Sequence, residues 1–163
     1  MRVKISNKLF SITGKSKVRD EEGKDLFKVK GRFLSPTKLK KICDLEGNTL
    51  FVVRNKWFNW LHHTTYIFNA DGEQIGYITK NKYSISNSIK AEDFEDDLKI
   101  TGKFFHRTLN ILKNGNQIGT ITVDWSFFTD KFTLEVNENE NLAFYVALVI
   151  AVDNLIDKRQ KDK

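Results

Sequence analysis

The stretch that decides the fold is NLAFYVALVIAVDNLI, residues 141–156. From Leu142 to Val152 the only polar side-chain group is the Tyr145 hydroxyl, so a helix over this stretch is apolar on every face. Such a helix must be surrounded by protein or by lipid. The apolar run is shorter than the roughly 20 residues that cross a bilayer. We therefore predict a helix over residues 141–157 that is enclosed by protein.

Most of the remaining chain alternates short apolar segments with turn signals, which is typical of an antiparallel meander. Four turn cores combine an acidic or amide residue with the glycine that a tight hairpin requires: Glu22-Gly23, Glu46-Gly47, Asp71-Gly72 and Asn114-Gly115. The flanking segments are rich in Val, Ile, Thr, Phe and Tyr, which suit a half-buried pleated surface. We predict about twelve strands, near residues 8–13, 16–20, 25–30, 38–44, 49–55, 63–69, 74–80, 83–90, 97–102, 108–113, 117–123 and 131–136.

The chain of 163 residues is predicted to form one domain, residues 1–163, with the acidic segment 91–97 as a surface connection and 158–163 as a charged tail. The fold class is mostly β: a closed antiparallel β-barrel around the C-terminal helix. Cys43 is the lone cysteine, so no internal disulfide can form, which fits a reducing, cytoplasmic setting. Cys43 lies at the end of a predicted strand with no histidine nearby in sequence, which favours a buried structural thiol. The N-terminal residues lack the apolar core of a secretory signal.

Two parts of the chain carry a resemblance to a known family. The segment VDWSFFTDKFTLEV (123–136) followed by NLAFYVALVIAVDNLID (141–157) resembles the end of the LURP-one-related family, in which an aromatic-rich strand, a polar turn and a hydrophobic helix close the chain. The segment KLFSITGKSKVRDEEGKDLFKVKGRF (8–33) also looks similar. The resemblance, to the small bacterial members in particular, implies the tubby C-terminal fold. Tubby domains bind phosphatidylinositol bisphosphate through Lys and Arg on neighbouring strands, whereas no activity carries over from the LURP-one proteins.

Charge and aromatic residues suggest where a ligand would bind. The net charge is +6, and residues 1–82 hold a balance of +9 against −3 for residues 83–163. A basic half can attract an anionic membrane, an acidic protein or nucleic acid, of which nucleic acid is not favoured here. Solvent-facing lysines on strand surfaces are the plainer interpretation. Lys38, Lys40 and Lys41 form the densest basic cluster.

The stretch RNKWFNWLHHTTY (54–66) adds aromatic side chains to basic ones. These aromatic residues could enter a membrane interface beside phosphate-binding cations, could bind a protein partner, or could plug one end of the barrel or pack on the helix. We take as candidate ligand-binding residues Lys38, Lys40, Lys41, Arg54, Lys56, Trp57 and Trp60.

No motif in the chain demands a particular chemistry. There is no phosphate-binding loop, dinucleotide fingerprint or nucleophile elbow. His62 and His63 are adjacent on a predicted strand and therefore point to opposite faces, and the acidic segment 91–97 lacks EF-hand spacing. We expect no catalytic residue, metal or cofactor. The predicted function is a non-enzymatic domain that binds anionic phospholipid or phosphoinositide headgroups. The alternative is a protein-interaction or scaffold protein, and in either case we expect no transmembrane segment and a cytoplasmic protein, peripheral to the membrane if it binds lipid.

Overall fold

The structure is a computed structural model that describes residues 1–7, 15–31, 35–58, 62–81, 89–102, 107–124 and 130–155. The described chain forms twelve strands followed by one helix. The elements are β1 (Arg2–Asn7), β2 (Lys15–Asp20), β3 (Asp25–Gly31), β4 (Lys40–Cys43), β5 (Thr49–Asn55), β6 (His62–Phe68), β7 (Gln74–Asn81), β8 (Ile89–Glu92), β9 (Leu98–Thr101), β10 (Thr108–Lys113), β11 (Asn116–Asp124), β12 (Asp130–Val136) and α1 (Leu142–Leu155). The predicted fold class is confirmed.

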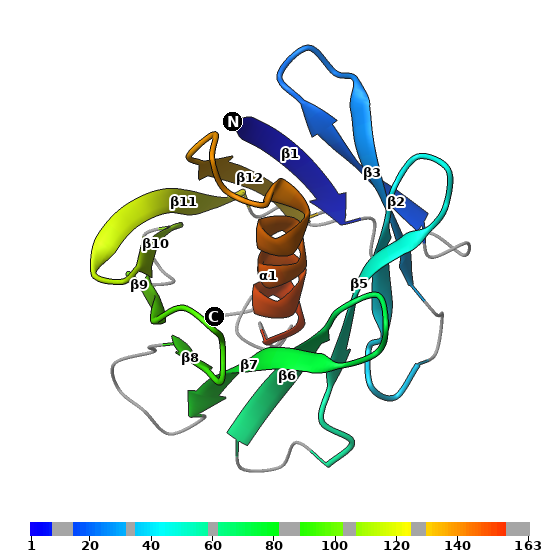
Figure 1. Ribbon diagram of the computed structural model, residues 1–163. Helices are drawn as coiled ribbons and strands as arrows, with labels where there is room; N and C mark the ends of the chain where they lie inside the picture. Colours follow the sequence, from blue (N-terminus) through cyan, green and yellow to red (C-terminus); the bar gives the residue numbers. More distant parts are fainter. Residues whose placement is uncertain are drawn as a thin grey trace.

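The strands form a closed barrel around α1 (Figure 1). Each strand pairs antiparallel with its neighbours in sequence, and β12 returns to pair with β1, where Val3 lies opposite Leu134 and Ile5 opposite Phe132. Side chains alone just fill an eight-stranded barrel, so a ring of this size needs further material inside it. The helix supplies that material, because an α-helix with its side chains is about 10–12 Å across.

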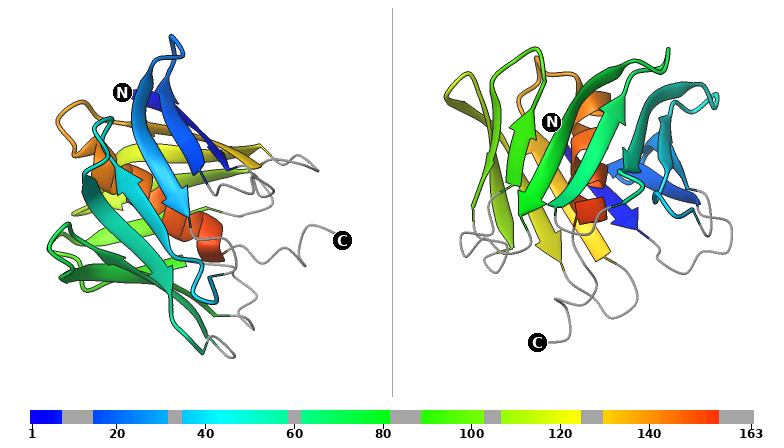
Figure 2. Two further views of the ribbon diagram at one scale, coloured as in Figure 1. Left: turned by 90° about the vertical axis from the view of Figure 1, so that its right-hand side faces the viewer. Right: turned by 90° about the horizontal axis from the view of Figure 1, so that it is seen from below.

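The interior helix is buried on all its faces, as the sequence predicts. Val146, Leu148 and Val149 are 0% exposed and Ile150 is 1% exposed. Both views of Figure 2 place the helix between strands on opposite sides of the ring. Asn141 caps its first turn by accepting a hydrogen bond from the Phe144 amide at 3.2 Å. Within the described residues, no helix has the length and apolar character needed to cross a membrane.

Aromatic rings fill the barrel where the helix begins. The ring of Phe144 makes edge-on contacts with Phe51 at 6.0 Å and with Phe94 at 5.8 Å between centroids. Phe94 packs over Gly76, where an added Cβ would lie 2.4 Å from the Phe94 ring. Gly76 also has a positive φ of 154°. This position therefore needs glycine for close approach as well as for conformation.

The structure adds one strand that the sequence did not predict and shifts the bounds of another. The first strand is β1, Arg2–Asn7, whereas the predicted stretch 8–13 lies outside the described residues. The strand forms at 2–7 because Val3 and Ile5 alternate with charged residues and become fully buried between β2 and β12. Of the strand predicted at 83–90, residues 83–88 lie outside the described residues, and residues 89 and 90 begin β8, Ile89–Glu92. Residues 91 and 92 therefore belong to the sheet and not to the acidic connection.

Leu148 provides a test of the enclosed helix. Leu148→Asp places a charge where every side is apolar and should prevent folding, whereas Leu148→Ala should lower the free energy of unfolding by about 2–5 kcal/mol. The matched control is Leu45→Asp, because Leu45 lies in a turn and is 45% exposed. We expect this control to remain a soluble protein with a nearly unchanged melting temperature. A soluble Leu148→Asp protein that melts like Leu45→Asp would refute the enclosed helix; thermal melts and size-exclusion chromatography give the answer.

Candidate functional site

Three of the predicted basic residues lie together on the outer face of β4 and β5. Lys41 lies opposite Val52, and Arg54 follows Val52 by two residues on the same face. This makes Lys41 and Arg54 diagonal neighbours, a spacing of roughly 7–8 Å between backbones. Lys56 comes directly after β5, and all three residues are exposed. We call Lys41, Arg54 and Lys56 the basic strip.

The cations of the basic strip are available to bind a ligand. The Arg54 guanidinium carbon lies 4.6 Å from the centroid of the Phe68 ring, a cation–π contact that orients the side chain. This contact leaves the guanidinium N–H groups able to bind an oxyanion in bidentate geometry. Within the described part of the chain, none of the three forms an ion pair with a carboxylate.

The cations on β2 differ from those of the basic strip because a neighbouring carboxylate already pairs with them. Lys17 and Arg19 both bind the side chain of Asp25, the latter at 2.8 Å. The hydrogen bond from Lys17, followed by that from Arg19, holds the pKa of the Asp25 carboxyl below its usual value. An incoming anion would compete with this carboxylate on β2, whereas on β4 and β5 it would not.

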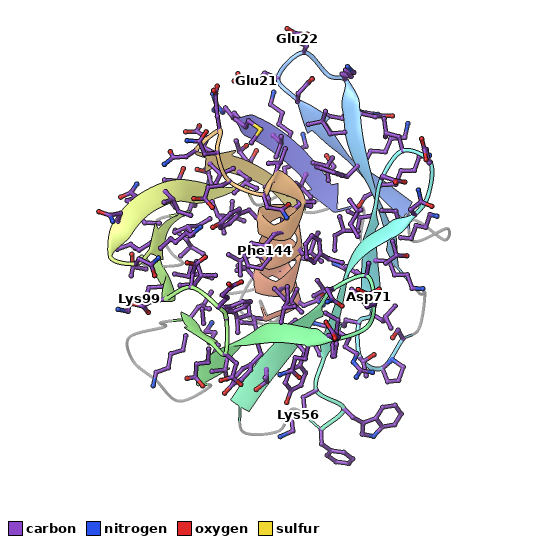
Figure 3. All side chains as sticks on the ribbon, in the orientation of Figure 1. Glu21, Glu22, Lys56, Asp71, Lys99 and Phe144 are labelled. Atoms are coloured by element: carbon purple, nitrogen blue, oxygen red, sulfur yellow. The ribbon has the colours of Figure 1, made fainter. Side chains whose placement is uncertain are left out.

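Two aromatic residues project from the barrel next to the basic strip. Trp57 is 69% exposed and Phe58 is 78% exposed, so the interpretation that they plug the barrel is wrong for both. Their neighbour Lys56 points away from the barrel at the bottom of Figure 3. Trp60, the third aromatic candidate, lies outside the described residues. We call Trp57 and Phe58 the aromatic tip.

Lys38 and Lys40 contact the end of α1 and do not join the basic strip. Lys40 lies opposite Val53, on the inner face of the sheet, and its Nζ is 2.7 Å from Asp153 Oδ2. Lys38 Nζ donates to the backbone carbonyl of Asn154 at 3.3 Å, and Asn154 Nδ2 donates back to the Lys38 carbonyl at 3.1 Å. The cluster predicted from sequence is therefore divided by strand alternation, and two of its lysines anchor the helix.

The two ends of the barrel differ in charge. Because neighbouring strands are antiparallel, successive connections lie at opposite ends of the barrel, and α1 runs from one end to the other. At the end where α1 begins, six described connections, 21–24, 44–48, 69–73, 93–97, 114–115 and 137–141, contain twelve carboxylates and one lysine, Lys24. At the end where α1 ends, the described connecting residues include Lys38, Lys56 and Arg107 and no carboxylate. We call these the acidic end and the basic end.

The other titratable and metal-binding side chains form no metal site in the described residues. No three His, Cys, Asp or Glu side chains converge there on one point. Cys43 is 1% exposed, as expected for a structural thiol. Asp96 is held by Asn114 and Lys113, and these hydrogen bonds lower the pKa of its carboxyl. The arrangement that the structure brings together is suited to binding an anion beside an apolar surface.

The fold and the comparisons together identify the family of the protein. A closed antiparallel barrel filled by a hydrophobic C-terminal helix defines a tubby-type barrel. The chain belongs to the LURP-one-related family, whose model matches residues 1–153. An X-ray structure of a protein from Arabidopsis thaliana is similar, with a TM-score of 0.62 and 15% sequence identity over 94% of this chain and 91% of that chain, which supports the fold alone. No curated protein matches the sequence.

Substituting Lys40 tests its role as a helix anchor. Lys40→Met removes the cation from Asp153, whose side chain is only 9% exposed, and should lower the free energy of unfolding. We expect a loss of about 2–4 kcal/mol, less than for a fully buried pair because the Lys40 side chain reaches solvent. The neighbouring change Lys41→Met is the control and should alter stability by about 0.5 kcal/mol or less. Urea denaturation measures both, and equal small effects would contradict the anchoring role.

Proposed function

We propose that this protein is a non-enzymatic binding domain for anionic phospholipid headgroups, and that the basic strip holds the phosphate. The observation that carries the proposal is the position of three available cations beside an exposed aromatic tip. The barrel supplies a rigid wall for the strip, because Lys41 and Arg54 come from paired strands. The protein would act at the surface of a membrane without spanning it.

The physical basis is electrostatic attraction combined with oriented hydrogen bonding. Each Lys or Arg near an anionic bilayer contributes about 1 kcal/mol. Arg54 adds geometric preference, because its planar N–H groups match two phosphate oxygens. The tubby-type architecture favours a phosphoinositide, so phosphatidylinositol bisphosphate is the probe of choice.

The exposed aromatic tip also supports a second function, binding to a protein partner. Trp and Arg are both enriched at the centres of protein interfaces, and Trp57 lies close to Arg54 in the sequence. The two functions differ in their response to membranes and salt. Lipid binding requires vesicles and weakens steeply as salt screens charges beyond about 8–10 Å. A protein partner would be bound without vesicles.

Vesicle flotation tests the lipid function. The variant Lys41→Gln, Arg54→Gln, Lys56→Gln removes three charges from the basic strip and should bind vesicles containing phosphatidylinositol bisphosphate about one hundredfold more weakly. The matched control is Arg2→Gln, Lys24→Gln, Lys99→Gln, which also removes one arginine and two lysines and alters exposed residues only. We expect the control to bind almost like the unsubstituted protein.

The outcomes separate the two functions. Equal recovery of the unsubstituted protein with neutral and with anionic vesicles, or no recovery with either, would exclude headgroup binding and leave the protein-interaction function. Equal weakening by both triple variants would show that only net charge matters and that the basic strip is not a site.

A further inference from the structure

The aromatic tip and the basic strip lie at one end of a strongly polarised barrel. Trp57 and Phe58 follow β5 at the basic end, and Lys56 precedes them in sequence. Their exposed fractions of 69% and 78% contrast with a core whose apolar side chains are almost fully enclosed. Exposed aromatic side chains beside cations are typical of surfaces that enter the headgroup region of a membrane.

The described connections give the basic end a second feature. They are residues 35–39, 56–58, 102 and 107, and they contain Lys38, Lys56 and Arg107 and no Asp or Glu. The described part of this end therefore suits an anionic, partly apolar surface.

The acidic end has the opposite property. Its twelve carboxylates include Glu21 and Glu22, in the turn between β2 and β3. A negatively charged bilayer would repel the acidic end and attract the basic end, so the barrel has a preferred orientation in its field.

We propose that the barrel docks end-on to an anionic bilayer, with Trp57 and Phe58 inserted among the headgroups and the acidic end directed away. The inference rests on the proposed lipid function and adds the orientation of the barrel to it. Lys56 and Arg54 then lie at the height of the lipid phosphates, because Lys56 adjoins the aromatic tip and Arg54 is two residues from Lys56. Lys41 is level with Val52, further from the bilayer, and attracts the headgroups across water within the screening length of about 8–10 Å. The barrel wall beyond Arg54 stays in water.

The competing geometry is side-on docking, in which the wall of β4 and β5 lies flat on the membrane. Val52 distinguishes the two, since it is opposite Lys41 on the outer wall and away from the tip. Asp71 marks the acidic end, because it lies in the turn between β6 and β7. End-on docking predicts that a probe at position 58 enters the bilayer and that probes at 52 and 71 do not.

Depth-dependent fluorescence quenching tests the orientation. Cys43→Ser removes the lone native cysteine, and Phe58→Cys, Val52→Cys and Asp71→Cys then carry one environment-sensitive fluorophore each. Flotation of each labelled protein with anionic vesicles is measured first. We expect quenching by brominated lipid at position 58 only. Bound protein with an unquenched probe at 58, or with equal quenching at 52, would overturn end-on docking and leave the lipid function intact, whereas absence of binding by the unsubstituted protein would end both.

Labelling at position 58 replaces the Phe58 ring, so a second variant tests insertion of the aromatic tip without a label. Trp57→Ser, Phe58→Ser should weaken vesicle binding about tenfold while keeping its salt dependence, because the lost contribution is apolar. Leu45→Ser is the matched control, as it removes an exposed apolar side chain at the acidic end and should leave binding unchanged. Equal binding by the two variants would overturn insertion of the aromatic tip.

Discussion

The fold depends on one constraint: a helix without a polar face cannot lie on the surface of a sheet. Residues 143 to 152 of α1 are buried except for Phe144, which is partly covered by other rings. An open sheet would cover one side of this helix and leave the other side in water. The meander therefore has to close, and closure brings β1 to β12 across nearly the whole chain. Closure also removes both sheet edges, which would otherwise be free to pair with other chains.

An apolar helix in an apolar tube has no contact that fixes its depth, and polar groups at its two ends supply one. Where α1 begins, Glu140 accepts hydrogen bonds from Lys113 at 3.1 Å and from the Tyr145 hydroxyl at 3.0 Å. Burial and the Glu140 carboxylate together raise the pKa of Tyr145, so the phenol stays protonated as the donor. Where α1 ends, Lys40 pairs with Asp153. Hydrogen bonds have strict lengths, so a shift of the helix along the barrel would break both sets.

The sequence predicted the features that local signals define and missed those that depend on distant partners. The glycine hairpins and the apolar run need only neighbouring residues, and both are present where expected. The apolar helix predicted that the sheet closes, but the strand that closes it was missed, because β1 pairs with β12 and Met1 bonds to Val136, 135 residues away, through no local signal. Strand alternation could have predicted that the basic cluster is divided. Ile42 is a core residue that points inward, so Lys40, two residues before it, lies on the same inner face, whereas Lys41 lies on the outer face. The exposure of Trp57 could not have been predicted, because tryptophan suits both a plugged barrel and an exposed tip.

The polarity of the barrel follows from the same regular topology. In a meander of antiparallel strands, every second connection returns to the same end. The acidic residues recur at alternate connections, from Glu22 in the first hairpin to Glu138 before the helix, and so all of these gather at one end. Along the chain the charge appears as a basic half followed by a weakly acidic half. The difference between the two ends has another origin, because the acidic connections come from both halves of the chain. Orientation at a charged surface is therefore a property of the alternation of turns and does not require any single residue.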